Sequence, residues 1–206
     1  MDIDKSAIIE EGSKIGENVI IGANTFIGAS TIIEDDVVIG KNCIIGSDPD
    51  QPQIHLLGDG KGEIVIKSST VIKDFVVISK PTINEYTEIK KKCYLMTNAY
   101  IAHDCSLEEG VILGHGSRLS GFTKVGRYSN IGAGAVTHQN AEIGDCVIVG
   151  ANSFVKGKLI SGLKYVGTNN KIVGVNKIGI ERSNLTNSEK EELIKKAIKI
   201  IKVTDS

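Results

Sequence analysis

The feature that most constrains this chain is an aliphatic residue that recurs every six positions over most of its length. The series comprises Ile3, Ile9, Ile15, Ile21, Ile27, Ile33, Ile39, Ile45, Ile66, Ile72, Ile78, Ile89, Leu95, Ile101, Leu107, Leu113, Leu119, Val125, Ile131, Ile143, Val149 and Val155, with Thr137 alone out of pattern in its last run. A period of six fits neither a helix, at about 3.6 residues per turn, nor the simple alternation of a strand. It fits short strands joined by tight turns, in which three hexads form one triangular coil of about 18 residues.

The composition supports such a stack of coils. The chain has 23 Gly, no Trp and only 4% aromatic residues, so its core must be filled by aliphatic side chains. Gly adopts unusual backbone angles at low cost and suits the corners. Roughly seven to eight coils spaced about 4.8 Å apart predict an all-β parallel β-helix on the order of 35 Å tall. The period alone does not determine its handedness.

The second inward position of each hexad lies four residues after the aliphatic one and holds mainly small side chains: Thr25, Thr31, Val37, Cys43, Cys93, Cys105 and Val147. We therefore interpret three of the four cysteines as small buried hydrophobic residues rather than reactive thiols. No CxxC pair exists to suggest a zinc knuckle or a redox site.

The pattern predicts a β-helix over 1–156 with two ejected loops, 47–63 and 79–88. After Val155 it fades, and 157–206 is expected to be irregular chain followed by a helix. Thr186 and Glu189 match a capping box that would begin this helix, at about 187–203. Its apolar stripe should pack on its own prism or on a neighbour's.

Charge and hydropathy exclude several classes of protein. A net charge of −1 argues against nucleic-acid binding. No apolar run is long enough to span a membrane, and the first residues lack a secretory signal, so we expect a cytoplasmic protein. We predict no metal and no permanently bound cofactor. The γ-class carbonic anhydrases, also hexad prisms, bind metal through a His pair five apart, whereas the His residues here are 55, 103, 115 and 138.

One column of the prism has the composition of a general-base site. Residues 18 apart should lie above one another, which aligns His103, Gly121 and Gln139, with Asp104 beside the His. His103 should point outward and accept a proton, and Asp104 could orient its ring. The Gly121 N–H could donate to an oxyanion. From spacing alone, such a pair is more often an ordinary polar corner.

Two longer segments are more specific than the hexads. The segment 95–105, with Ala102, His103, Asp104 and Cys105, and the segment 174–182 resemble the UDP-N-acetylglucosamine acyltransferases, a family of hexapeptide-repeat enzymes that begin lipid A synthesis. The segment 131–136 is similar to that of nucleotide-amino-sugar N-acyltransferases. The resemblance implies a left-handed β-helix and a homotrimer with its active sites between neighbouring subunits.

The resemblance also implies residue roles. His103 would be the base, Asp104 its orienting acid and Gly121 the oxyanion donor. Gln139 and His138 match residues of the family's cleft, and Asn176 and Arg182 match residues that hold its nucleotide sugar. Beside the resemblance, Tyr100 and, on the first loop, Asp50 and Gln51 are further substrate-binding candidates. Coenzyme A would need one or two cations, for which Lys156 and Lys158 are candidates, and Gly134 is a further candidate for binding it.

Four positions depart from the lipid A enzymes. Ser79, Tyr100 and Phe122 stand where that family has His, and Ile178 stands where it has Glu. We therefore expect transfer from acyl-CoA, or alternatively acyl-carrier protein, to the amino group of a UDP- or dTDP-linked amino deoxysugar for surface polysaccharide. Two alternatives stay open: O-acylation of UDP-N-acetylglucosamine in lipid A synthesis, and a non-catalytic assembly scaffold.

Overall fold

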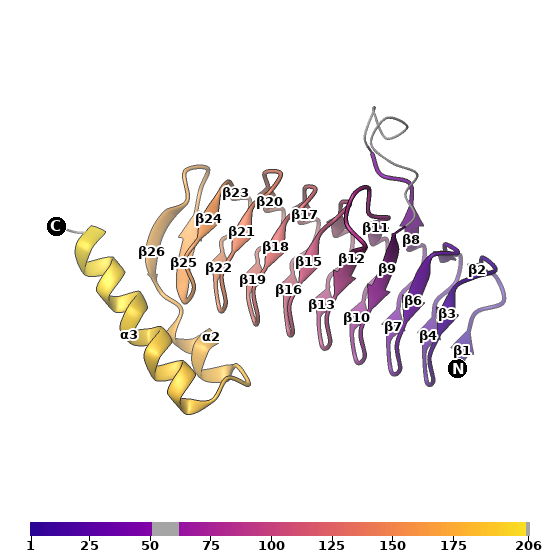
Figure 1. The fold of residues 1–206 in the computed structure, drawn as a ribbon, viewed down its shortest axis with the longest axis horizontal. Helices are drawn as coiled ribbons and strands as arrows, with labels where there is room; N and C mark the ends of the chain where they lie inside the picture. The colour runs from indigo at the N-terminus through magenta and orange to yellow at the C-terminus, as the bar shows by residue number, and fades with distance from the viewer. Residues whose placement is uncertain (51–61, 205–206) are drawn as a thin grey trace.

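The chain folds into a three-walled prism with two helices at one end (Figure 1). The computed structural model describes residues 1–50 and 62–204. The first wall contains β1 (Asp2–Ile3), β4 (Ile20–Ile21), β7 (Val38–Ile39), β10 (Val71–Ile72), β13 (Tyr94–Leu95), β16 (Ile112–Leu113), β19 (Asn130–Ile131), β22 (Ile148–Val149), β25 (Leu163–Val166) and β26 (Lys171–Val175). The second contains β2 (Ile8–Ile9), β5 (Phe26–Ile27), β8 (Ile44–Ser47), β11 (Val77–Ser79), β14 (Tyr100–Ile101), β17 (Arg118–Leu119), β20 (Val136–Thr137) and β23 (Phe154–Val155). The third contains β3 (Lys14–Ile15), β6 (Thr31–Ile33), β9 (Glu63–Ile66), β12 (Tyr86–Ile89), β15 (Ser106–Leu107), β18 (Lys124–Val125), β21 (Glu142–Ile143) and β24 (Lys158–Leu159).

The register follows the predicted 18-residue coil. In the first wall, for example, Leu95 pairs with Leu113, which pairs with Ile131. These strands are parallel, and the fold is that of a left-handed parallel β-helix, as the resemblance implies. The predicted fold class is confirmed.

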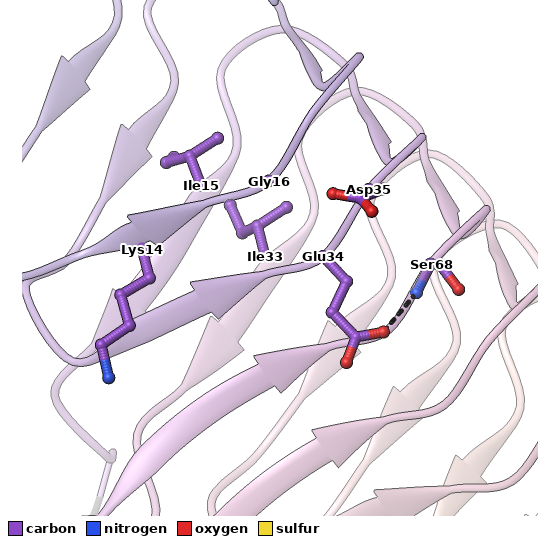
Figure 2. A pocket seen from close by; sticks show the side chains of 7 residues that line it. All are labelled: Lys14, Ile15, Gly16, Ile33, Glu34, Asp35 and Ser68. Atoms are coloured by element: carbon purple, nitrogen blue, oxygen red, sulfur yellow. Dashed lines mark hydrogen bonds between the residues drawn. The ribbon is translucent and has the colours of Figure 1, made fainter.

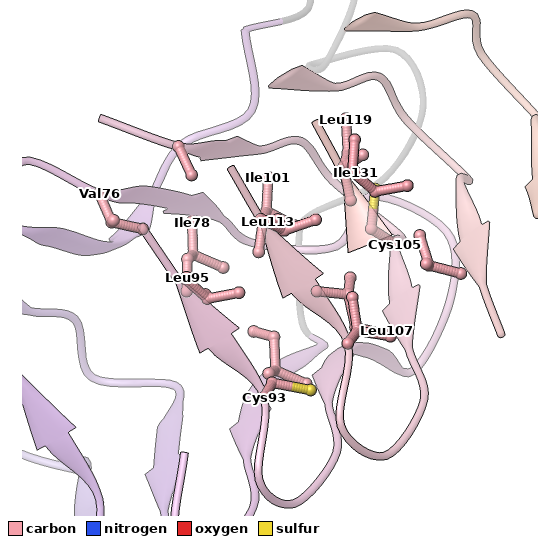
Figure 3. Close-up of a cluster of buried hydrophobic side chains, with 14 of the residues drawn as sticks. Val76, Ile78, Cys93, Leu95, Ile101, Cys105, Leu107, Leu113, Leu119 and Ile131 are labelled. Carbon is pink, nitrogen blue, oxygen red and sulfur yellow. The ribbon is translucent and has the colours of Figure 1, made fainter. Parts of the chain in front are cut away.

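The core is the aliphatic column that the period predicts. Side chains such as Ile78, Ile101 and Leu119 stack inside the prism (Figure 3) and are fully buried. Cys93 and Cys105 lie among them, and Cys43 is likewise buried in the same cluster, as predicted. Burial raises the pKa of Cys93 and of Cys105 to about 12, so neither is a thiolate at neutral pH.

Both predicted excursions interrupt the coil without shifting the inward column. After the first, Ile78 still pairs with Ile45, and after the second, Ile89 pairs with Ile66. Most of loop 47–63 lies outside the described residues. The second excursion is shorter than expected, because β11 extends to Ser79 and β12 begins at Tyr86.

The C-terminal part is more regular than the sequence suggests. The prism continues through β24, and β25 and β26 form an antiparallel hairpin that ends the first wall. A short helix, α2 (Lys177–Arg182), follows, and then α3 (Asn187–Thr204). The expected irregular stretch is therefore wrong for 158–182, where Gly162, Gly167, Asn169 and Asn170 stand in turns between strands. The capping box is confirmed: the Glu189 N–H donates to Thr186 Oγ1, and the Thr186 N–H donates to Glu189 Oε2.

Helix α3 packs on its own prism. Ala197 is buried in the main core cluster, and Ile200 and Ile201 pack against that cluster. Within the described residues, no helix is both long and apolar enough to cross a membrane.

Candidate active site

The edge between the second and third walls carries the predicted column. The Phe122 N–H donates to the His103 carbonyl at 3.1 Å, and the Asn140 N–H donates to the Gly121 carbonyl at 3.0 Å. Successive corners are thus joined one above the other. This places His103, Gly121 and Gln139 along one edge, where the spacing predicts them.

His103 and Asp104 form a hydrogen-bonded pair at this edge. His103 Nδ1 lies 2.6 Å from Asp104 Oδ2. The ring lies outside the aliphatic core, but only 8% of the His103 side chain is exposed. The second excursion contributes Thr82 beside it, and the Phe122 ring meets the imidazole edge-on at 5.2 Å. Our expectation of an openly outward His therefore needs correction, because neighbouring side chains cover it within one chain.

The Asp104 carboxylate is held by the second excursion. Its Oδ2 accepts from the hydroxyl of Thr82 at 2.6 Å and from the Thr82 N–H at 3.0 Å. Its Oδ1 accepts from the N–H groups of Ile83 at 3.1 Å and Asn84 at 2.6 Å. Successive backbone N–H groups make a concave anion site of this kind. Sequence reasoning missed these donors, because the excursion has no periodic register.

These contacts fix the charge of Asp104 and the tautomer of His103. Burial disfavours the charged carboxylate, but the donors from Thr82 and Asn84 outweigh it, so the pKa of Asp104 lies below its ordinary value. An ionised carboxylate only accepts hydrogen bonds. His103 Nδ1 must then carry the proton, and Nε2 presents a lone pair that can accept another proton.

Gly121 is required where it stands. A Cβ built on this residue would lie 2.5 Å from His103 Cε1 and 2.6 Å from Nε2, so any side chain would displace the imidazole. Among the described residues, none accepts a hydrogen bond from the Gly121 N–H. Gly121, whose N–H has no acceptor among the described residues, therefore lies against the imidazole.

Further predicted residues share this edge. His138 and Gln139 are exposed on the next coil, and Lys156 is exposed one coil beyond. The His138 N–H donates to the Val155 carbonyl, which joins these two coils at this edge. The His138 ring stacks edge-on with Phe154 at 6.1 Å.

On the adjoining second wall, the Tyr100 hydroxyl donates to Asp50 Oδ2 at 3.3 Å and lies 3.4 Å from the Ser79 hydroxyl. Tyr100 and Asp50, both substrate-binding candidates, and Ser79, a departure from the lipid A enzymes, thus lie together. Gln51 lies outside the described residues.

Asn176 and Arg182 lie elsewhere, at the start and the end of α2, beside the first wall near its edge with the third. Both line a pocket of about 450 Å³, together with Tyr128 and Lys164. Arg182 is exposed, but Asn176 is buried: its Oδ1 accepts from the Gly179 N–H at the start of α2, and its Nδ2 donates to the Cys146 carbonyl. The Asn176 amide thus serves as a helix cap, and its contact with a nucleotide sugar stays a prediction.

Two of the coenzyme A candidates are not at the His103 edge. Gly134 occupies the turn between the first and second walls, with φ of 66°, and its N–H donates to the His115 carbonyl. Lys158 lies on the third wall, where its ammonium pairs with Glu142 at 3.2 Å. Within one chain, neither Gly134 nor Lys158 therefore lies at the edge that carries the His103–Asp104 pair.

A pocket on the third wall offers a contrast (Figure 2). It has a volume of about 370 Å³ and includes Lys14, Glu34, Asp35 and Ser68. Its carboxylates are engaged, since Glu34 accepts from the Ser68 N–H at 3.1 Å and Asp35 accepts from the Glu17 N–H at 2.7 Å. These two carboxylates therefore support the coil.

Comparisons with known proteins agree with the repeat and the fold. Residues 18–48 match the bacterial transferase hexapeptide model, and residues 6–29 and 123–156 match the hexapeptide repeat of succinyl-transferase. An acyl-[acyl-carrier-protein]–UDP-N-acetylglucosamine O-acyltransferase of Gloeothece citriformis is 28% identical over 152 residues, which are 73% of this chain and 55% of that protein. The chain spans about half the length of the curated relatives it matches.

Solved structures give the same result. The UDP-N-acetylglucosamine acyltransferase of Campylobacter jejuni superposes with a TM-score of 0.78 at 24% identity, covering 94% of this chain and 82% of the other. The UDP-N-acetylglucosamine O-acyltransferase of Moraxella catarrhalis has a TM-score of 0.66 at 27% identity and covers 94% and 80%. The chain is a hexapeptide-repeat β-helix protein that resembles the UDP-N-acetylglucosamine acyltransferases in sequence and fold.

Proposed function

We propose that this protein is an acyltransferase that moves an acyl group from a thioester to a hydroxyl of a UDP-linked N-acetylamino sugar. The curated relative from Gloeothece citriformis is named as an O-acyltransferase that uses acyl-carrier protein, and it favours this reaction over the N-acylation from acyl-CoA that we expected from the sequence. The observation that carries the proposal is the His103–Asp104 pair, with Gly121 against the imidazole.

The proposed reaction proceeds by direct attack. His103 Nε2 removes the proton from the sugar hydroxyl as its oxygen attacks the thioester carbonyl. The oxyanion of the tetrahedral intermediate accepts a hydrogen bond from the Gly121 N–H. The carbon–sulfur bond then breaks, and the imidazolium returns its proton to the leaving thiolate. Asp104 stays ionised and stabilises the imidazolium.

In this proposal, the His103 edge of one copy of the chain and the Arg182 pocket of another copy together form the site. His103 lies on the edge between the second and third walls, whereas the pocket of Arg182 lies on the first wall. The outward residues of the third wall include Lys14, Lys124 and Glu142, whereas the first and second walls expose Ile20, Ile44 and Ile8. Apolar walls of this kind favour burial against another copy. A homotrimer would bring the edge of one subunit to the first wall of the next.

N-acylation of an amino sugar remains the second candidate, on one specific observation. Tyr100 and Ser79 occupy positions where the lipid A enzymes have His, and Tyr100 holds the Asp50 carboxylate on the same wall. A carboxylate favours an ammonium group over a neutral hydroxyl. Such a substrate would lose its ammonium proton before attack, and His103 would accept the proton released afterwards.

The test is a transfer assay on the purified chain. The donors are an acyl-carrier-protein thioester and acyl-CoA, and the acceptors are UDP-N-acetylglucosamine and a UDP-linked amino deoxysugar. Ester formation on the first acceptor is expected, and amide formation on the second would favour the alternative. Absence of product from every pair, with a folded protein, would reject the enzyme and favour a scaffold.

A further inference from the structure

Thr137 is the one residue out of pattern in the last run of the aliphatic column, and the strand ladder is irregular beside it. On either side of this coil the ladder is regular: the Ala102 N–H donates to the Leu119 carbonyl at 3.0 Å, and the His138 N–H donates to the Val155 carbonyl. Between them, the Ser120 N–H donates instead to the Thr137 hydroxyl at 2.9 Å. A side chain has thus replaced one bond of the sheet at the coil that carries Gly121.

Three hydroxyl groups complete this arrangement. The Ser120 hydroxyl donates to the Thr137 carbonyl at 2.6 Å, and the Thr123 hydroxyl donates to the Ser120 carbonyl at 2.6 Å. The Thr137 and Thr123 hydroxyls lie 2.8 Å apart, so the proton of Thr137 is directed to Thr123. Thr137 is 1% exposed and Thr123 is fully buried. Every polar group of Ser120 is therefore hydrogen-bonded to Thr137 or Thr123.

The planarity of the peptide bond carries this constraint to Gly121. The Ser120 carbonyl and the Gly121 N–H belong to one trans peptide unit and point in opposite directions. The carbonyl points inward, where it also accepts from Cys105 Sγ at 3.3 Å. The Gly121 N–H must then point away from the core, and a Cβ built on Gly121 would meet the His103 ring.

We propose that Thr137 is a positioning residue, whose hydroxyl holds the Ser120–Gly121 peptide so that its N–H is aimed at the oxyanion. The inference rests on the proposed acyl transfer. It explains why a polar residue interrupts an otherwise aliphatic column at this coil. Valine here would restore both the column and the regular sheet bond, and it would change the orientation of the donor.

The test is Thr137→Val, with Thr137→Ser to restore the hydroxyl. Losing one oxyanion donor costs about 10²–10³ in rate, so a displaced donor should lower kcat by at least roughly tenfold. KM should stay unchanged, and thermal stability should be equal or higher. Thr137→Ser should recover most of the rate.

Thr25→Val is the matched control. Its hydroxyl is buried in the same way, where it donates to the Gly40 carbonyl and accepts from the Cys43 N–H, but it lies far along the chain from the dyad. This variant should lose thermal stability and keep kcat. Wild-type kcat in Thr137→Val, or failure of Thr137→Ser to recover it, would overturn the inference.

A readout without substrate separates this inference from the proposed function. The amide resonance of Gly121 in a ¹⁵N-labelled protein should shift in Thr137→Val and return in Thr137→Ser. If the wild-type protein transfers no acyl group but the resonance moves as stated, the proposed function fails. The inference that Thr137 orients the Ser120–Gly121 peptide is then still supported. An unchanged Gly121 resonance would refute the inference whatever the activity.

Discussion

The same turn occurs at two edges of the prism, at Gly121 and at Arg127, but only at Arg127 is the backbone N–H capped by a side chain of the next coil. Gly121 and Arg127 each stand two residues after an inward aliphatic side chain, Leu119 and Val125. The Arg127 N–H is capped by Asp145 Oδ1 at 2.7 Å, and its guanidinium binds Asp145 Oδ2 as well. The Gly121 N–H has no such cap among the described residues. Where the next coil has no capping side chain, as at Gly121, the backbone N–H of the corner is left available to bind a substrate atom.

The largest effect should come from removing the proposed base at the uncapped edge. His103→Ala should lower the transfer rate by at least about 10²-fold, because proton transfer loses its acceptor. The fold should survive, since the ring lies outside the core and Asp104 keeps its donors from the second excursion. His115→Ala, at an exposed position with no proposed role, is the control. Near-wild-type turnover of His103→Ala would remove the assignment.

The pocket beside the capped edge should affect binding and leave the chemistry intact. Arg182→Ala should raise KM for the nucleotide sugar by roughly tenfold, equivalent to about 1.4 kcal/mol of lost binding free energy. Steady-state kinetics with the nucleotide sugar as the varied substrate measures this. A fall in kcat at constant KM would instead place Arg182 in the reaction itself.

The cap itself should be a matter of stability. Asp145→Ala should lower the free energy of unfolding by about 1–3 kcal/mol, because the Arg127 N–H loses its partner and the guanidinium loses a carboxylate. Urea denaturation measures the loss, and turnover should match the wild type. A large loss of turnover with unchanged stability would break the distinction between the two edges.

The inner sides of the two edges should behave alike. Cys105 Sγ lies under the Ser120 carbonyl, and Cys93 Sγ lies under the Glu108 carbonyl on the capped edge. Burial raises the pKa of both thiols to about 12, above the ordinary value near 9. Burial of the neutral thiols therefore stabilises the fold fully below about pH 9, and this contribution is lost between about pH 9 and 12 as the unfolded chain ionises.

Urea midpoints measured from pH 8 to 11 should fall over this window, and Cys93→Ala and Cys105→Ala should each flatten the decline. A midpoint independent of pH in the wild type would contradict the burial of both thiols.

The periodic parts of the molecule could be predicted from the sequence, and the insertions could not. A six-residue period determines which side chains point inward and which residues share a column, so the core, the buried cysteines and the alignment of His103 with Gly121 follow from it. Thr82 carries no such signal, because its segment leaves the coil and its contact with Asp104 depends on tertiary folding. The hairpin of β25 and β26 was missed for a similar reason: its strands lack the six-residue repeat.

The most direct test of the central claim is a crystal structure of the protein soaked with UDP-N-acetylglucosamine and, in parallel, with a UDP-linked amino deoxysugar. The proposed role of His103 predicts that the acceptor oxygen or nitrogen lies within about 3 Å of Nε2, in a cleft completed by a second copy of the chain. A sugar bound with its acceptor group away from His103, or a dyad that no bound sugar approaches, would contradict it.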